Sequence, residues 1–185
     1  MKKIIIYGSK SFAIILKDLL AYHNYPFVGY IDDFETERDE VIGNYEFVKE
    51  KYSRNEYQIL IGIGYNNLEG RWKIYQKIKK DYEIFTFIHK NAYVRNIENI
   101  GKGSIIMANV IIDANAMLGE LNVCWPGAIL NHDSKVESNT FISPNATVCG
   151  FVDIGSSCFI GAGAIIVDHV KVESRSFIKA GSIVK

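Results

Sequence analysis

Residues 142–166 read ISPNATVCGFVDIGSSCFIGAGAII, and their apolar anchors recur at every sixth position, as at Ile142, Val148 and Ile154. An α-helix would repeat apolar residues every 3.6 positions and an ordinary strand every two, so neither structure accounts for the pattern. A six-residue period instead suits a triangular prism, in which each hexad supplies one short strand and one corner. Three consecutive hexads then complete one coil of the prism.

The same frame runs through residues 88–185 without an insertion. Every sixth residue, starting at Ile88, is Ile, Val or Leu, with Cys124 as the one exception. Four positions after each anchor the side chain is usually small or β-branched, although Glu98 and Asn122 break this second pattern. Anchors and small residues are both expected to point into the prism, while successive coils stack as parallel strands. We therefore predict a parallel β-helix in the second half of the chain.

The first 87 residues have a different rhythm, in which predicted strands and helices alternate. This order is typical of a small α/β domain with a parallel sheet. Ser9 or Ser11 is the expected cap of the first helix. The expected strands are 3–7, 27–31, 58–63 and 84–88, and the expected helices are 12–22, 45–52 and 68–81.

Composition excludes several classes of function. The chain has 21 basic and 21 acidic residues, so no global basic field is available to bind nucleic acid. No apolar stretch is long enough to span a membrane, and the N-terminal apolar run is too short for a signal peptide. The three cysteines form neither a CxxC pair nor a metal-binding spacing, so we expect reduced thiols, no metal site and a cytoplasmic location.

Ligands of a parallel sheet bind at the carboxyl ends of its strands. Three polar segments follow predicted strands: the loop from Gly8 to Phe12, the pair Asp32-Asp33, and the segment 64–67. The first loop lacks the G-x-G-x-x-G spacing, which argues against a dinucleotide cofactor. Its N–H groups could still hold a phosphate, and adjacent carboxylates suit a nucleobase or sugar hydroxyls. A solvated turn is the alternative interpretation of Asp32-Asp33.

The β-helix carries a candidate catalytic pair in His132 and Asp133, where the carboxylate would support the histidine as a general base. His132 is third in its hexad and is expected to point outward. Gly150 stands three hexads, and so one full coil, further along, and its open backbone could offer an N–H group to an oxyanion. His169 and Trp125 also face outward. We interpret His169 as peripheral and Trp125 as a subunit contact, with a ligand contact as the alternative for Trp125. The alternative is that His132 and Asp133 are exposed surface residues without a catalytic role.

These features together resemble the PglD/NeuD-type sugar acetyltransferases, in which a small Rossmann-like domain precedes a left-handed hexapeptide β-helix. The resemblance covers essentially the whole chain and is most specific in segments 31–33, 61–64, 130–134 and 154–164. It implies a homotrimer that transfers an acetyl group from acetyl-CoA to the amino group of a nucleotide-linked amino-dideoxy sugar, in bacterial surface glycan biosynthesis.

The same resemblance assigns roles to individual residues. His132 becomes the general base, Asp133 its supporting acid and Gly150 the oxyanion donor. Acetyl-CoA is expected along Phe141, Ala162 and Ala180. The nucleotide sugar is expected at Gly8, Lys10, Ser11, Phe12, Asp32, Asp33, Gly64 and Asn67.

Two other functions fit the sequence. The first is O-acetylation of a sugar hydroxyl, of the sialic acid type, which would use the same residues. The second is a non-catalytic β-helix that serves as a binding module. His132 and Gly150 lie in one column of the β-helix, and this placement argues against a non-catalytic binding module.

Overall fold

The computed structural model describes residues 1–35 and 37–185, which divide into two compact units, Met1–Phe85 and Thr86–Lys185. The sequence placed the boundary after residue 87. It falls slightly earlier because the N–H of Phe87 already donates to the carbonyl of Ser104, one coil further along the β-helix.

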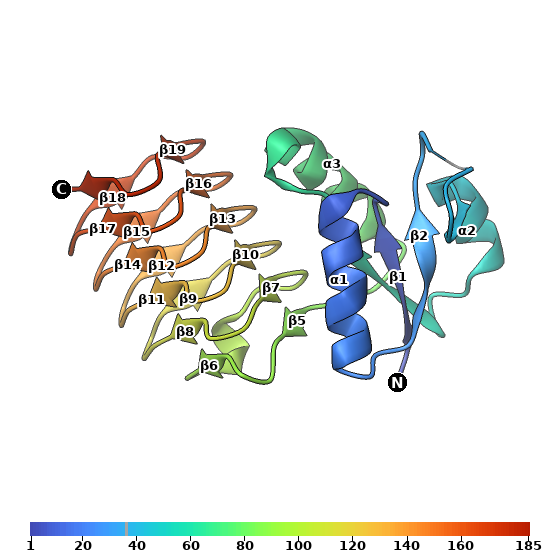
Figure 1. Ribbon diagram of the computed structural model, residues 1–185, viewed down its shortest axis with the longest axis horizontal. Helices are drawn as coiled ribbons and strands as arrows, with labels where there is room; N and C mark the ends of the chain where they lie inside the picture. The colour runs from blue at the N-terminus through green and yellow to red at the C-terminus, as the bar shows by residue number, and fades with distance from the viewer. Residues whose placement is uncertain (36) are drawn as a thin grey trace. The chain divides into compact units, whose positions relative to one another are not determined.

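The first unit is a four-stranded parallel sheet with helices, as predicted (Figure 1). Its strand order is β3-β2-β1-β4, so the first strand lies in the middle. In chain order the elements are β1 (Lys3–Tyr7), α1 (Ser11–Tyr22), β2 (Phe27–Ile31), β3 (Val41–Gly43), α2 (Tyr45–Lys51), β4 (Tyr57–Ile61), η1 (Tyr65–Asn67) and α3 (Leu68–Ile78).

The fourth strand of this sheet differs from the prediction. The segment 84–88 was expected to supply it, but Ile84 makes only an isolated bridge to Ile59, and Phe87–Ile88 is β5 of the second unit. The short β3 fills the place at the other edge, beside β2. The predicted cap of α1 is also wrong. Lys10 occupies the N-cap position without a capping side-chain hydrogen bond, and the hydroxyl of Ser9 donates elsewhere.

The second unit is the predicted β-helix, built from two-residue strands that pair with the strands one coil away. The pairing joins Val123 to Phe141 and Ile129 to Thr147, so paired residues are three hexads apart. Its three sheets contain β5, β7 (Ile105–Ile106), β10 (Val123–Cys124), β13 (Phe141–Ile142), β16 (Phe159–Ile160) and β19 (Phe177–Ile178); β6 (Tyr93–Val94), β8 (Ile111–Ile112), β11 (Ile129–Leu130), β14 (Thr147–Val148), β17 (Ile165–Ile166) and β20 (Ile183–Val184); and β9 (Met117–Leu118), β12 (Lys135–Val136), β15 (Asp153–Ile154) and β18 (Lys171–Val172).

The interior of the β-helix is the ladder of anchors that the sequence predicts. Every anchor from Ile88 to Val184 belongs to the apolar core or packs against it. The two residues that break the pattern have separate explanations. Asn122 is fully buried, where its amide donates to the carbonyl of Gly119 and accepts from the N–H of Thr140. Glu98 is exposed in η2 (Ile97–Asn99), which replaces a regular strand.

From Gly103 onward, each corner of the β-helix turns through one residue in the left-handed conformation. These residues recur every six positions, from Gly103 (φ +75°) to Gly181 (φ +69°). Gly and Asn tolerate this conformation best, and they occupy most of the corners. Asp133, with φ +58°, stands at one of them, so the corner geometry fixes its place beside His132.

Candidate functional site

The first unit contains a cavity of about 550 Å³ at the carboxyl ends of β1, β2 and β4. It is lined in part by all of the residues that the sequence assigned to substrate: Gly8, Lys10, Ser11, Phe12, Asp32, Asp33, Gly64 and Asn67. The parallel topology brings these three loops together because neighbouring strands end at the same edge of the sheet. Their roles within the cavity differ.

Gly8 allows two loops to meet at the base of the cavity. Its φ of +101° lies in a region that side chains rarely adopt, and a Cβ there would stand 3.2 Å from the carbonyl oxygen of Gly62. Gly62 in turn has no room for a side chain, because its Cβ would lie 2.6 Å from Ile6. The two glycines therefore let the loops after β1 and β4 approach each other closely.

Asp32 holds the cavity together rather than standing free in it. Its side chain accepts hydrogen bonds from the buried hydroxyl of Ser9, at 2.7 Å, and from the N–H groups of Phe34 and Glu35. Burial on its own would raise the pKa of Asp32, but the Ser9 hydroxyl and the two N–H groups bring it below its ordinary value. Asp32 is thus an ionised acceptor that joins the loops after β1 and β2, not a solvated turn.

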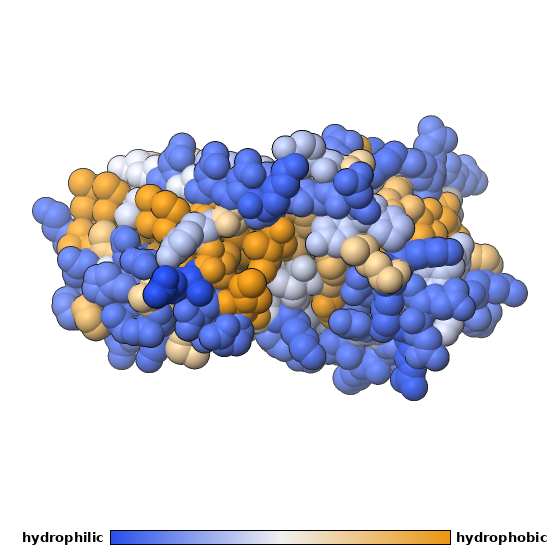
Figure 2. Space-filling view, turned by 90° about the horizontal axis from the view of Figure 1, so that it is seen from below, coloured by the Kyte–Doolittle hydropathy of each residue, from blue (hydrophilic) through white to orange (hydrophobic). Residues whose placement is uncertain are grey.

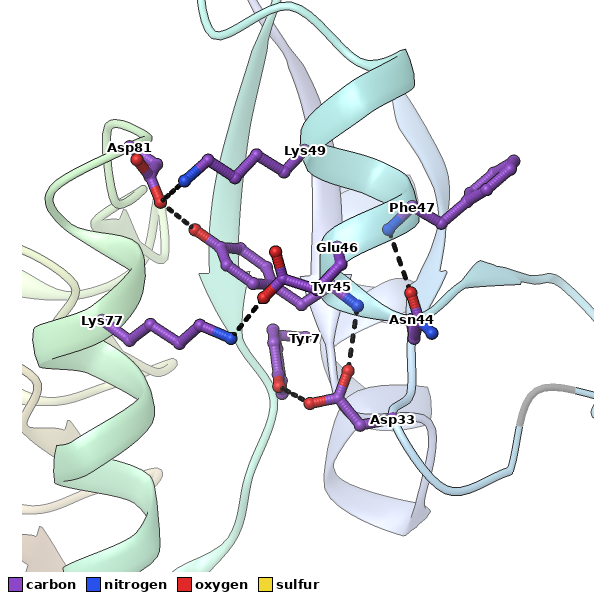
Figure 3. A network of polar contacts seen from close by, with 9 residues as sticks. All are labelled: Tyr7, Asp33, Asn44, Tyr45, Glu46, Phe47, Lys49, Lys77 and Asp81. Carbon is purple, nitrogen blue, oxygen red and sulfur yellow. Dashed lines mark hydrogen bonds and ion pairs between the residues drawn. The ribbon is translucent and has the colours of Figure 1, made fainter.

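Asp33 anchors the start of α2 (Figure 3). One carboxylate oxygen accepts from the hydroxyl of Tyr7, and the other accepts from the N–H of Tyr45 at 2.9 Å. The Tyr45 hydroxyl donates to Asp81, which also pairs with Lys49 at 2.9 Å. Burial, followed by the contact with Asp33, raises the pKa of Tyr7, so its hydroxyl remains a donor.

The other predicted polar residues are partly engaged within the unit. Lys10 forms an exposed ion pair with Glu35 at 3.2 Å. Asn67 accepts the N–H of Gly70 at 2.8 Å and so caps α3. A side chain at Gly64 would meet no neighbouring atom within 4 Å, so this position opens into free space.

Arg71 is a cavity residue that the sequence interpretation missed. It is fully buried on α3, and its Nε donates to the carbonyl of Ile63 at 3.0 Å. Burial lowers the pKa of Arg71 to about 9, so the guanidinium is still charged at neutral pH. It shares the buried face of the helix with Tyr75 and Ile78, and this spacing was the available signal.

The second unit places His132 and Asp133 in contact, as the sequence predicts. The Nδ1 atom of His132 lies 3.0 Å from Asp133 Oδ2, and the amide of Asn115 donates to Asp133 Oδ1 at 3.0 Å. The His132 hydrogen bond, followed by that of Asn115, lowers the pKa of Asp133. The imidazole is about half exposed, at 52%. An ionised carboxylate on Nδ1 favours the tautomer that leaves Nε2 as an acceptor.

Gly150 stands beside the imidazole, at the position that the three-hexad coil predicts. A Cβ on Gly150 would lie 2.9 Å from His132 Cε1 and 3.1 Å from Nε2, so only glycine leaves room for the ring. The sequence suggested an open backbone at this position, but Gly150 is buried because the ring covers it. Its N–H donates no hydrogen bond to any residue that the structure describes.

The three residues expected along acetyl-CoA differ in exposure. Ala162 and Ala180 are exposed and follow each other by one coil. Phe141 is only 1% exposed, so its ring offers no open surface to a ligand in this structure. Trp125, expected on the outer surface, is of intermediate exposure.

Two further kinds of functional feature are absent from the residues that the structure describes. Among residues 1–35 and 37–185, no cluster of three metal-ligating side chains is found. Within the same residues, none of the helices has both the length and the apolar character needed to cross a membrane.

Comparisons with known families match both ends of the chain. Residues 3–78 match the PglD N-terminal domain, and residues 152–185 match the hexapeptide repeat of succinyl-transferase. These matches support the resemblance to PglD/NeuD-type sugar acetyltransferases: the first unit resembles the PglD N-terminal domain, and the second unit carries the expected hexapeptide repeat. A comparison with curated proteins gives no match.

Solved structures share the fold over the full length. The acetyltransferase domain of PglB from Neisseria gonorrhoeae has a TM-score of 0.86 at 23% identity, covering 100% of this chain and 92% of that one. A mutant of the GDP-perosamine N-acetyl transferase from Caulobacter crescentus, in complex with CoA and GDP-perosamine, has a TM-score of 0.90 at 23% identity, covering 100% and 89%. WeeI from Acinetobacter baumannii has a TM-score of 0.62 at 19% identity, covering 100% and 97%.

Proposed function

We propose that this chain, a PglD-type N-terminal unit joined to a hexapeptide β-helix, is an acetyl-CoA-dependent N-acetyltransferase of a nucleotide-linked amino sugar. The observation that carries the proposal is the imidazole of His132, held through Nδ1 by Asp133 and seated against Gly150. This arrangement leaves Nε2 of the imidazole beside a glycine whose N–H donates no hydrogen bond to any described residue.

The proposed reaction is acyl transfer through a tetrahedral intermediate. The amine of the sugar attacks the thioester carbon, so that a C–N bond forms and the amine gives its proton to Nε2 of His132. The N–H of Gly150 stabilises the oxyanion. When the intermediate collapses, the C–S bond breaks and the proton on Nε2 passes to the departing sulfur, which leaves as the thiol of CoA. His132 then returns to its starting form.

The cavity of the first unit is proposed to hold the nucleotide portion of the acceptor. Its size suits part of a nucleotide, and the buried guanidinium of Arg71 together with Lys10 supplies positive charge suited to phosphate. Asp32 and Asp33 hold the loops that shape it. The Caulobacter crescentus relative was solved with GDP-perosamine, which is an acceptor of this class.

Acetyl-CoA is proposed to lie along the exposed column of Ala162 and Ala180, where small side chains leave room for an extended ligand. The PglB domain was solved in complex with acetyl coenzyme A, which supports this co-substrate. A cytoplasmic location follows from these two proposed substrates.

A homotrimer is proposed as the working assembly. The outward side chains of the sheet from β6 to β20 include exposed apolar residues, and apolar side chains lie among the polar ones on the β-helix in Figure 2. Such a surface is suited to a partner copy. The residues are Tyr93, Ile111, Ile165 and Ile183.

An acceptor panel tests the function. Purified protein is given acetyl-CoA with UDP-, dTDP- or GDP-linked amino sugars, or with free sialic acid, and thiol release is followed. We expect release with an amino-sugar nucleotide. Thiol release with sialic acid alone would show that the acceptor group is a hydroxyl and not an amine. No release with any acceptor, together with no binding of acetyl-CoA by calorimetry, would contradict catalysis altogether.

A further inference from the structure

Phe151 is a corner residue whose identity neither burial nor backbone preference explains. Its φ is +59°, in the left-handed region that favours Gly, Asn and Asp. Leu121, the other large apolar residue at a corner, has φ +59° and is fully buried, so its packing compensates for the conformation. Phe151 is 49% exposed. A bulky residue in an unfavourable conformation without full burial points to another role.

The contacts of Phe151 indicate that role. Its ring meets the His132 imidazole edge to face, with centroids 5.3 Å apart and an interplanar angle of 84°. On the next coil, the His169 ring stacks on Phe151 at 4.9 Å and 2°. Asp133, Phe151 and His169 occupy one corner column on successive coils, and all three are left-handed. The corner geometry therefore aligns the three side chains beside the imidazole.

The imidazole of His132 is thus bounded by three groups. Asp133 holds Nδ1, Gly150 lies against the ring atoms Cε1 and Nε2, and Phe151 blocks a further side. A half-exposed histidine with only a single hydrogen bond would otherwise be free to change rotamer. The aromatic contact removes that freedom.

We propose that Phe151 is a positioning residue, supported by the stacked ring of His169, that holds the His132 imidazole over Gly150. The proposal rests on the acetyl transfer proposed above. Because the ring contacts of Phe151 are with His132 and His169, we expect Phe151 to contribute to the turnover of bound substrates and not to their binding. The left-handed conformation of Phe151 destabilises the backbone at this corner, whereas its ring keeps the imidazole of His132 in one orientation.

The first test substitutes Phe151→Asn, which suits a left-handed corner and removes the ring. We expect an unfolding temperature at or above that of wild type, a kcat lowered about tenfold, equal to about 1.4 kcal/mol of barrier, and an unchanged KM for acetyl-CoA. Phe151→Tyr should restore kcat. His169→Asn, which removes only the support, should lower kcat by less. Arg175→Asn, at another exposed left-handed corner, is the matched control and should leave kcat unchanged.

The second test is independent of activity. Ring currents from Phe151 should displace the NMR signals of the His132 and His169 ring protons in the free protein, and Phe151→Asn should abolish both displacements. His132 signals that are the same in wild type and Phe151→Asn would overturn the contact. Absence of transfer by the wild-type enzyme overturns the proposed function, whereas transfer that Phe151→Asn leaves unaffected overturns only the role of Phe151.

Discussion

The cavity of the first unit and the histidine site of the β-helix use carboxylates in opposite ways. Asp32 and Asp33 accept hydrogen bonds from groups of their own unit, so they fix the shape of a cavity. Asp133 lies at an exposed corner and fixes the orientation of a single imidazole. Under the proposed function, this contrast corresponds to one unit that holds the acceptor and another that moves a proton.

The largest effect is expected at the base itself. His132→Ala removes the group proposed to take the proton, so kcat should fall by about 10²–10⁴-fold. The side chain is half exposed and outside the core, so the unfolding temperature should stay near that of wild type. Steady-state kinetics and thermal unfolding check both parts. Wild-type turnover in this variant would remove His132 from the mechanism.

A smaller change at Gly150 should act through the same ring. In Gly150→Ala the new Cβ would stand 2.9 Å from His132 Cε1, so the imidazole must move. A base displaced by about 1 Å loses on the order of a hundredfold in kcat. In the His132→Ala background the same substitution should cause no further loss, because the ring is gone. An additional loss there would show that Gly150 acts independently of the imidazole.

A pair of aspartate variants tests the division directly. Asp133→Ala should lower kcat by about tenfold with little change in stability, because solvent screens an exposed pair such as His132 and Asp133. Asp33→Ala deprives the Tyr7 hydroxyl and the Tyr45 N–H of their acceptor, and should lower the free energy of unfolding by about 1–3 kcal/mol. Urea unfolding and kinetics on both variants provide the measurement. A loss of stability in Asp133→Ala together with a loss of kcat alone in Asp33→Ala would reverse the roles assigned to the two carboxylates.

The smallest expected effect is a pH dependence of stability. The pKa of Asp32 is lower in the folded chain than in the unfolded one, so its contribution is complete above about pH 4 and is lost as the pH falls through the folded value. Asp32→Asn should therefore flatten the acid limb of unfolding free energy against pH. Asp39→Asn, exposed on the same unit, is the control. An unchanged acid limb in Asp32→Asn would show that the carboxylate is not selectively stabilised.

The β-helix could be predicted closely because each side chain repeats the same environment. A fixed period of six placed His132 beside Gly150 without any structure. The period also contained the corner signal, since Asn115, Asn139 and Asn145 mark left-handed residues. Phe151 was missed because its importance lies in a ring contact to His132, which depends on side-chain direction as well as on column.

The first unit could be predicted only in part. Strand ends located the cavity, because parallel topology places them at one edge. The role of each polar side chain did not follow, since it depends on long-range partners such as Tyr45 for Asp33. The strand Val41–Gly43 was missed because three residues of intermediate burial carry no clear period. Arg71 was missed because a charged residue on the buried face of a helix looks, in the sequence, like a break in the apolar pattern of that face.

The most direct test of the division is a calorimetric titration of the nucleotide-linked amino sugar into the His132→Ala variant, once the acceptor panel has identified that sugar. The account predicts a Kd equal to that of the wild-type enzyme, although the variant no longer acetylates the sugar. A Kd weakened tenfold or more, or acetylation that continues at the wild-type rate, would contradict the claim that the cavity binds the acceptor while His132 and Gly150 carry out the transfer.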